Sequence, residues 1–376
     1  MSVLSFAAKK FRTVGYSLYL WIVVRPQQVW KLMRHPEFYS SPSYFPECAD
    51  KLRSRSSQFW NQMGEIMRFG RINTLYYVWG YDVKTRKEQQ EYVHYNTFMY
   101  RRSELNVFRK GSTICLLRDK LLFSIFLEGL GLRGPKNVYY YDGKELLDMA
   151  SKKAVDETTL LSSGDNRLFC KPLGGECGKG IFVLDIKTGQ LYVGKEKITY
   201  NQLLDRLGKE RFLLQDFVVQ HDEMSRLHPQ SINTIRLVTV RSLKDGCLHV
   251  MPSIMRIGAG DSVVDNTSQG GLAVGINLES GYLKRFGFYK PKYGTKVAEH
   301  PDSHIVFTDF KIPFFEEAVR QAKLMHSMLP DIHSIGWDIA IGEDGPIFIE
   351  GNDNWEITGP QTCNGGLKKE FEEYFF

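Results

Sequence analysis

The chain has 376 residues, of which 43% are hydrophobic and 13% aromatic, so it can bury a large core and is expected to form two or three subdomains. This composition excludes an intrinsically disordered protein. The formal net charge of +6 is uneven, because residues 1–110 carry 18 Lys and Arg against 8 Asp and Glu, whereas the remainder carries 31 against 35. Such a basic part is compatible with a solvated surface and with contact to anionic lipid, a lipid-linked phosphate or nucleic acid.

The six cysteines are scattered, with no CxxC pair and no Cys/His spacing typical of zinc sites, which favours a reducing cytoplasm. The longest apolar run, at residues 14–24, is shorter than the about 20 residues that cross a bilayer, and it lacks a signal-peptide cleavage pattern. Lys9, Lys10 and Arg12 precede the run and Arg25 follows it. Two interpretations remain open: a helix docked on the protein, and a helix lying on a membrane surface.

Residues 1 to about 110 are predicted to be mainly helical, with aromatic-rich pieces at 59–77 and 88–99 and breaks at several prolines. From residue 112 onward, predicted helices and strands alternate. Later helices are expected at 119–130, 144–153 and 314–328. Strands expected at 137–141, 167–171, 181–185, 190–193 and 211–217 indicate a small antiparallel sheet. Strands at 234–241, 248–256 and 272–277, with a C-terminal hairpin, indicate a second, larger sheet.

Two lysines precede a glycine-rich loop. Lys120 opens the helix expected at 119–130, and Lys171 ends a strand just before the loop at 174–180. Because glycine lacks a Cβ and tolerates positive φ, backbone N–H groups of such a loop can close on phosphate oxygens. The loop has neither the GxxxxGK[ST] pattern nor the GxGxxG pattern. By itself it is equally compatible with a hairpin turn.

Polar residues also follow the later strands. The apolar strand at 211–217 runs into a polar turn that ends at Glu223, and such a hinge can offer backbone groups to adenine and a carboxylate to ribose. Arg236 stands in the opening part of the next strand. Arg256 precedes a polar loop that contains Asn266. For both arginines the alternative is a surface ion pair.

The most informative segment is the predicted hairpin at 336–352. Its Asp344-Gly345 pair, between two apolar runs, favours a tight turn. With symmetric pairing, Asp338 lies opposite or diagonal to Glu350, with Cβ atoms about 5–8 Å apart, and Asn352 shares the face of Glu350. Two carboxylates and a carboxamide suit Mg²⁺, which is usually shared with phosphates. The alternative is an exposed hairpin end with unrelated acids.

In chain order, the two lysines with the glycine loop, the hinge, the arginines and the Asp…Glu-x-Asn hairpin resemble the ATP-grasp superfamily. More narrowly, they resemble the sugar-transfer-associated ATP-grasp family found with polysaccharide-biosynthesis genes, over about residues 70–360. The signatures are Asn233-Thr-Ile-Arg236, Asp265-Asn266 with Gly270-Gly271, and Glu350-Gly-Asn352.

The resemblance implies an α/β (α+β) fold in which two α/β subdomains grip ATP. The ATP-grasp domain would occupy residues 111–376, with a lid subdomain at about 155–217 and a metal-binding core subdomain at about 218–376. A mainly helical, basic N-terminal region at 1–110 would precede it.

The resemblance also implies roles for individual residues. The ATP-binding residues would be Lys120, Lys171, Gly174, Gly175, Gly178, Lys179, Gly180, Gln215, Asp216, Phe217, Val218 and Glu223. Asp222 is an equal candidate for the ribose contact. The catalytic residues would be Arg236, Arg256 and Asn266, and the Mg²⁺ ligands would be Asp338, Glu350 and Asn352. Structural roles are expected for His221, His228 and His333.

The function that follows is an ATP- and Mg²⁺-dependent ligase that joins a carboxylate to an amine or similar nucleophile through an acyl phosphate. By family analogy, the ligase modifies a cell-surface polysaccharide or its precursor. Two alternatives stay open: a kinase that phosphorylates a hydroxyl, and a non-catalytic nucleotide-binding component of a polysaccharide assembly complex. The expected partners are a small-molecule carboxylate and an amine or sugar-linked acceptor. No nucleic acid is expected, and the location is cytoplasmic, with peripheral contact to the inner face of an anionic membrane as an open interpretation.

Overall fold

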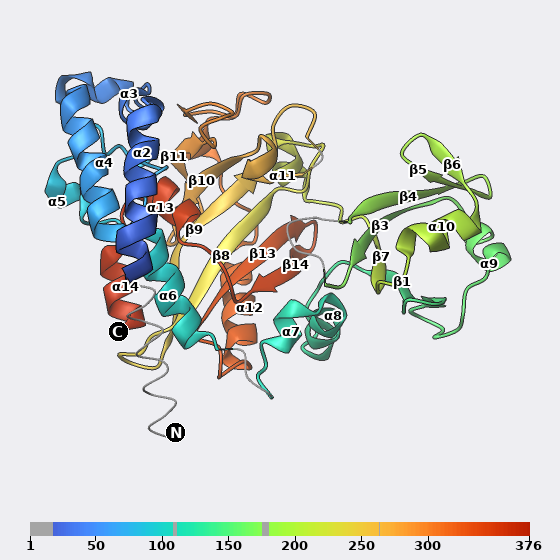
Figure 1. The fold of residues 1–376 in the computed structure, drawn as a ribbon. Helices are drawn as coiled ribbons and strands as arrows, with labels where there is room; N and C mark the ends of the chain where they lie inside the picture. The colour runs from blue at the N-terminus through green and yellow to red at the C-terminus, as the bar shows by residue number, and fades with distance from the viewer. Residues whose placement is uncertain (1–17, 108–110, 175–179, 263) are drawn as a thin grey trace.

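The computed structural model describes residues 18–107, 111–174, 180–262 and 264–376. They form a helical N-terminal region and two seven-stranded sheets with helices packed against them (Figure 1). The unit built on β1 to β7 projects to one side of the larger unit (Figure 1). Within these ranges, no helix is long and apolar enough to cross a membrane.

Short helices occupy the chain before the first sheet, which confirms the predicted helical N-terminal region. They are η1 (Leu20–Val24), α2 (Arg25–Arg34), α3 (Glu37–Ser40), η2 (Pro46–Lys51), α4 (Arg55–Phe69), α5 (Arg86–Gln89), α6 (Tyr95–Leu105), α7 (Cys115–Arg118) and α8 (Lys120–Gly129). Helices α2 and α4 pack through Leu32 and Ile66, with Ile72 beside them. The piece expected at 88–99 is divided between α5 and α6.

The piece expected at 59–77 is helical only in its first part, so this prediction is partly wrong. Helix α4 ends because Gly70 adopts a φ of 79°, a left-handed conformation that glycine reaches without a Cβ clash. The following residues form turns instead. Their aromatic side chains, including Tyr76, Trp79 and Tyr81, pack into a core with strands of the larger sheet. Burial of these side chains against the sheet outweighs local helix propensity there.

The smaller sheet has the strand order β2-β1-β7-β3-β4-β5-β6 and is antiparallel throughout. Its strands are β1 (Asn137–Tyr141), β2 (Leu146–Asp148), β3 (Asn166–Pro172), β4 (Phe182–Lys187), β5 (Gln190–Val193), β6 (Glu196–Ile198) and β7 (Phe212–Asp216). Helices α9 (Glu157–Leu161) and α10 (Tyr200–Leu207) share its apolar core. The sheet begins at Asn137, so it includes two strands that precede the predicted lid range of about 155–217.

The helix expected at 144–153 is wrong. Asp142 Oδ1 accepts hydrogen bonds from the N–H groups of Lys144 and Glu145, at 2.8 and 2.9 Å, and Gly143 takes a φ of 101°. These contacts turn the chain back so that β2 pairs with β1. An Asp-Gly turn between short apolar runs favours such a hairpin over a helix.

The larger sheet has the strand order β12-β11-β10-β9-β8-β13-β14. Its strands are β8 (Thr234–Arg241), β9 (Leu248–Ile257), β10 (Leu272–Ile276), β11 (Leu283–Phe288), β12 (Lys296–Val297), β13 (Ser334–Gly342) and β14 (Gly345–Asn352). The accompanying helices are α11 (Asp222–Leu227), η3 (Thr267–Gln269), η4 (Phe307–Asp309), α12 (Phe315–Ser327), α13 (Thr358–Asn364) and α14 (Lys368–Phe375).

Alternate residues of the central strands face opposite sides of this sheet, as the two-residue period of a strand requires. Leu237 packs into the core that includes α12 and α8, whereas its neighbour Val238 packs with α6 and α14. Helices therefore cover both faces, and the N-terminal region is fixed to the larger sheet through α6.

Candidate active site

Four neighbouring strands of the larger sheet, in the order β9-β8-β13-β14, carry the charged residues singled out in the sequence. The register pairs Asp338 on β13 with Glu350 on β14 and, on the other side, with Arg236 on β8. The hairpin closes with Gly342 opposite Gly345, and a β-bulge between Asp338 and Ile339 then shifts the register by one residue, so that Asp338 lies opposite Glu350. Directly opposed residues lie on the same face, so the three side chains form one row across the sheet.

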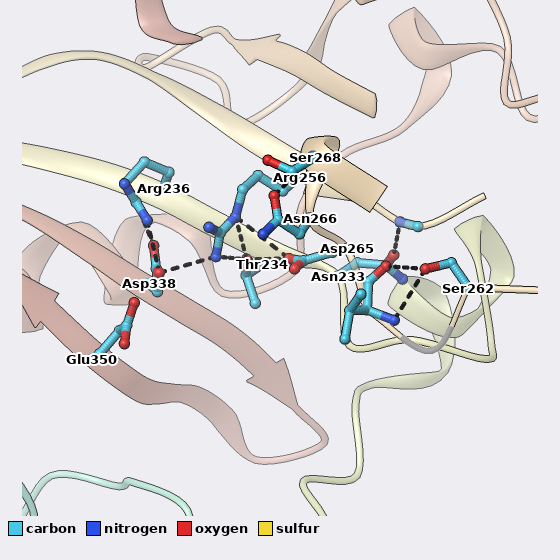
Figure 2. A network of polar contacts seen from close by, with 12 residues as sticks. Asn233, Thr234, Arg236, Arg256, Ser262, Asp265, Asn266, Ser268, Asp338 and Glu350 are labelled. Atoms are coloured by element: carbon cyan, nitrogen blue, oxygen red, sulfur yellow. Dashed lines mark hydrogen bonds and ion pairs between the residues drawn. The ribbon is translucent and has the colours of Figure 1, made fainter. Parts of the chain in front are cut away.

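Both arginines bind Asp338 (Figure 2). Arg236 donates from Nε to Oδ1 and from Nη2 to Oδ2, the second at 2.9 Å, and Nη2 of Arg256 lies 3.0 Å from Oδ2. The side chain of Asp338 is 3% exposed and those of both arginines are 20% exposed. These contacts are buried ion pairs, and the alternative of a surface ion pair is therefore excluded.

The position of Arg236 depends on a glycine. A Cβ atom at Gly336 would lie 2.7 Å from Cβ of Trp355 and 3.3 Å from Cδ of Arg236. Because the first of these distances is too short for two carbon atoms, a side chain at position 336 would displace one neighbour or the other.

Thr234 and Asp265 extend the row, and the sequence analysis gave neither residue a role (Figure 2). Arg256 donates from Nε and Nη2 to Oγ1 of Thr234, at 3.0 and 2.7 Å, and its Nε lies 3.6 Å from Oδ2 of Asp265. The N–H of Thr234 donates to the same Asp265 oxygen at 3.1 Å. Both residues stand inside the signatures that carried the family resemblance, which is the signal that points to them.

Asn266, predicted to be catalytic, lies beside Arg256 in Figure 2. Its Oδ1 accepts a hydrogen bond from the N–H of Ser268 at 2.9 Å and caps η3. The loop then closes at Gly271, where a Cβ would lie 2.7 Å from the carbonyl oxygen of Asp265. The backbone packs so closely there that only glycine fits, and this packing holds Asp265 and Asn266 against the arginine.

Burial and neighbouring charges together shift the pKa values of the cluster. Burial disfavours ionised Asp338, but the charges of Arg236 and Arg256 outweigh burial and lower the pKa of Asp338. For Arg256, burial disfavours the charge, and the carboxylates of Asp265, Asp338 and Glu350 raise its pKa. The pKa of Glu350 is raised, first by burial and then by the charge of Asp338. Burial also raises the pKa of Asp265. The cluster thus holds more carboxylates than its two arginines neutralise.

The hairpin offers oxygen donors that fit a divalent cation. Nδ2 of Asn352 donates to Oε1 of Glu350 at 3.2 Å, so the amide and the carboxylate lie together. Asp338 adds a second carboxylate, and hard oxygen donors of this kind suit Mg²⁺. Within the described part of the chain, no group of three or more His, Cys, Asp or Glu side chains is arranged to hold a metal. Because the arginines engage both oxygens of Asp338, Glu350 and Asn352 are the first candidates for ligands.

Lys171, on the smaller sheet, lies close enough to the cluster for the charge of Glu350 to affect its pKa. It lies on β3 and is buried, and its pKa is lowered to about 8, mainly by burial and further by the charge of Lys120, while Glu350 acts in the opposite direction. Lys120 begins α8, and its Nζ donates to the carbonyl oxygen of Leu173 at 3.1 Å. The two predicted lysines therefore lie near each other, beside the start of the glycine loop.

The lowered pKa of Lys171 predicts a pH effect on nucleotide affinity. Below about pH 8 the amine is charged and attracts phosphate oxygens; above it the charge is lost, whereas ATP keeps its charge. We expect the Kd for Mg-ATP to increase as pH rises through 8, measured by calorimetry at several pH values. Lys171→Met should bind Mg-ATP more weakly, and its Kd should change less with pH. If the Kd of the unmodified protein changed equally little with pH, this role of Lys171 would be contradicted.

The middle of the glycine loop lies outside the described residues. Gly175, Gly178 and Lys179 belong to this part, and their role as a lid over the triphosphate stays a prediction. Gly174 and Gly180 border it, and Gly180 adopts a φ of 76°.

The predicted adenine hinge joins the two sheets. Gln215 and Asp216 end β7, and Phe217 and Val218 follow in a segment without helix or strand before α11. Gln215 is buried, and Oδ2 of Asp216 lies 3.2 Å from Nζ of Lys136. The hinge thus leaves the smaller sheet on a strand next to Lys171, since β7 pairs with β3.

The two candidates for the ribose contact begin α11 and are exposed. Oε2 of Glu223 accepts a hydrogen bond from Arg226 at 2.7 Å, and the N–H of Asp222 donates to Glu343 at 2.7 Å. These contacts do not favour one carboxylate over the other, so both Glu223 and Asp222 remain candidates for the ribose contact.

The three histidines expected to be structural make local contacts. His221 accepts from the N–H of Glu223 at 3.1 Å and caps α11. His228 contacts the hydroxyl of Ser231 at 3.0 Å. Burial lowers the pKa of His333 to about 4, so this imidazole is neutral near pH 7.

A further ion pair next to the hairpin was not foreseen from the sequence. Arg118 donates from Nε and Nη2 to the two carboxylate oxygens of Asp353, at 3.0 and 2.7 Å, and Asp353 is buried. Asp353 directly follows Asn352, and Arg118 lies two residues before Lys120. The pair therefore fixes the start of α8 relative to the end of β14.

Several solved structures are similar to this chain at low sequence identity. A D-alanine-D-alanine ligase from Helicobacter pylori has 15% identity, with 69% of this chain and 58% of that chain covered and a TM-score of 0.37. An L-amino acid ligase from Bacillus licheniformis has 12% identity, with 70% and 49% covered and a TM-score of 0.36. An N5-carboxyaminoimidazole ribonucleotide synthetase from Thermotoga maritima has 10% identity, with 64% and 43% covered and a TM-score of 0.34. The chain thus spans about half the length of these structures. A comparison with curated proteins gave no significant match.

The match to a family model is more extensive. The model described as sugar-transfer associated ATP-grasp matches residues 101–373, well over half of the chain. This match confirms the ATP-grasp fold, with its mixed helices and antiparallel sheets, that the sequence predicted. The chain belongs to the sugar-transfer associated ATP-grasp family.

Proposed function

We propose that the protein is an ATP- and Mg²⁺-dependent ligase that joins a carboxylate to an amine or similar nucleophile through an acyl phosphate. The observation that carries this proposal is the largely buried row of Arg256, Arg236, Asp338 and Glu350, to which the smaller sheet contributes Lys171. Such a row provides fixed positive charge beside oxygen donors for a cation, and phosphoryl transfer requires mainly positioning and charge neutralisation.

In the proposed reaction, a carboxylate oxygen attacks the γ-phosphorus of ATP and the bond to the β–γ bridging oxygen breaks, so that ADP leaves. The nucleophile then attacks the acyl carbon, loses a proton, and inorganic phosphate leaves. Bound Mg²⁺ would supply charge neutralisation for the triphosphate, held by Glu350 and Asn352 with Asp338 beside them. Lys120 and Lys171 would bind phosphate oxygens.

Arg236 and Arg256 are proposed to stabilise the transferring phosphoryl group and the oxyanion. Their guanidinium groups are held by Asp338 and Thr234 before any substrate arrives. Preorganised donors lower a barrier because they need no rearrangement when charge develops. Each arginine still has N–H donors beyond those used by its partners, since a guanidinium carries five.

The substrates and the subdomain arrangement are proposals of the same kind. The family's description as sugar-transfer associated supports a polysaccharide or its precursor as the product, with a small-molecule carboxylate and an amine or sugar-linked acceptor. We further propose that residues from about 155 to 217 act as a lid on a core formed by residues from about 218 onward, in a cytoplasmic protein. The separate smaller sheet, which reaches the cluster through Lys171, supports this division.

Replacing Glu350 with glutamine tests the proposal. Because burial raises the pKa of Glu350, its charge costs free energy in the native state, and the amide should be tolerated without loss of stability. Turnover should fall by about 100-fold or more, because a correctly bound metal supplies several kcal/mol to such a reaction.

The measurements are ADP release with a panel of carboxylates plus amines, and thermal unfolding. The exposed Glu317→Gln serves as the control and should behave as the unmodified protein. Full turnover in Glu350→Gln would remove Glu350 from the mechanism, and unfolding would make it a structural residue.

A further inference from the structure

The helix that runs from residue 18 to Arg34, through η1 and α2, carries an outward apolar stripe. The stripe consists of Tyr19, Ile22, Trp30 and Met33, and each of these side chains is more than half exposed. They recur at intervals compatible with one helix face, with the exposed Pro26 between them. Four large apolar side chains gathered on one surface helix are more than the scattered single residues of an ordinary surface.

The opposite face of the same helix already has its packing partners. Leu32 is fully buried with Ile66 of α4, and Val29 packs beside it. Nε of Arg25 donates to the carbonyl oxygen of Met67 at 3.1 Å, which fixes the helix against α4. The helix therefore presents apolar side chains on two sides, and within the described residues only one of them is packed against α4.

The charged residues of the helix itself have one sign. Residues 18–34 contain Arg25, Lys31 and Arg34 and no Asp or Glu, and Lys31 and Arg34 are exposed. One exposed cation lies on a tryptophan ring of the helix: Arg34 is 4.4 Å from the ring centroid of Trp30. Tryptophan next to arginine is typical of the boundary between lipid headgroups and acyl chains. The amphipathic ring lies at this boundary, and the cation contacts lipid phosphate.

We propose that this stripe, with its flanking cations, is a docking surface for an anionic lipid bilayer, on which the helix lies parallel to the membrane plane. Apolar side chains enter the headgroup boundary while the cations bind lipid phosphates. A second copy of the chain is disfavoured as the occupant, because a symmetric dimer would bring the same cations together. Nucleic acid would use the cations but would leave the apolar stripe exposed. The inference is independent of the proposed ligase reaction.

Binding of the full-length protein to vesicles tests the surface. We expect cosedimentation with vesicles of equal parts phosphatidylcholine and phosphatidylglycerol, little with phosphatidylcholine alone, and weaker binding as salt is added. Ile22→Glu combined with Trp30→Glu should lower the partition coefficient by about tenfold or more, because two interfacial apolar side chains are replaced by anions.

Matched single variants separate this surface from general hydrophobicity. Met33 and Met328 are 57% and 54% exposed, on α2 and at the end of α12. Met33→Glu should weaken vesicle binding and Met328→Glu should not, and both should keep the unmodified thermal unfolding. The proposal would be overturned if Met33→Glu and Met328→Glu weakened vesicle binding equally. It would also be overturned if the unmodified protein bound both vesicle types equally or bound neither. So would a dimer in lipid-free solution that Ile22→Glu with Trp30→Glu converts to monomer, since the stripe would then bind a second copy. ADP release in solution should be unchanged in all of these variants, so a failed ligase assay leaves this test intact.

Discussion

Replacing Arg256 with methionine is expected to destabilise the protein by about 3–5 kcal/mol and to abolish turnover, because removal of one member of a buried ion pair leaves its partner unpaired. Arg256 contacts Asp338 at 3.0 Å and lies 3.6 Å from Asp265, and both carboxylates are buried or nearly so. Arg256 also donates a hydrogen bond to Oγ1 of Thr234. The measurement is the free energy of unfolding in denaturant, together with ADP release under native conditions.

Arg320→Met is the matched control. Arg320 also pairs with a carboxylate, that of Glu317, but on the exposed surface of α12, where such a pair contributes little. A second variant, Arg256→Met with Asp265→Asn, should recover part of the lost stability because it removes one unpaired charge. If Arg256→Met unfolds like Arg320→Met, the buried cluster does not have the charge states described for it.

The second large effect is expected for Lys171→Met, which should lose the stabilisation that Mg-ATP gives the unmodified protein. A ligand at 100 times its Kd stabilises the native state by about 2.7 kcal/mol, and loss of a charged hydrogen bond to phosphate costs about 1.5–3 kcal/mol. Because burial lowers the pKa of Lys171 to about 8, its charge costs free energy in the folded protein without nucleotide. The variant without nucleotide should therefore be as stable as the unmodified protein.

Thermal unfolding with and without Mg-ATP measures this difference. Lys187→Met, on β4 of the same sheet, is the control, because Lys187 is exposed and pairs only loosely with Asp185, at 3.8 Å. Lys187→Met should show the same increase in Tm with Mg-ATP as the unmodified protein. A full shift in Lys171→Met would place the nucleotide elsewhere.

The central part of the fold was predictable because local rules decide it. The Asp344-Gly345 pair predicts the hairpin, but the pairing of Asp338 with Glu350 also requires a β-bulge between Asp338 and Ile339, which the turn does not specify. Short runs rich in β-branched and aromatic residues, such as β1 and β5, were predicted with the same bounds that the structure has. The arginines could be identified because they stand at strand positions beside recognisable polar loops.

Other features depend on contacts between distant segments and could not be read locally. The pairing of Arg236 with Asp338 requires β8 to lie next to β13, an order that no local pattern specifies. Asp265 reaches Thr234 only because the loop closes at Gly271. Residues 144–153 have acceptable helix propensity, which is why a helix was predicted there. Pairing of β2 with β1 in the sheet outweighs that local propensity.

Trapping the activated carboxylate with hydroxylamine tests the central claim most directly. The protein would be incubated with Mg-ATP, hydroxylamine and a panel of carboxylates, including amino acids, hydroxy acids and uronic acids, and products would be identified by mass spectrometry. The account predicts ADP, inorganic phosphate and a hydroxamate in equal amounts, each formed only when a suitable carboxylate is present. Formation of AMP and pyrophosphate would contradict it, because adenylation would then activate the carboxylate, and a stable phosphorylated hydroxyl would establish a kinase instead.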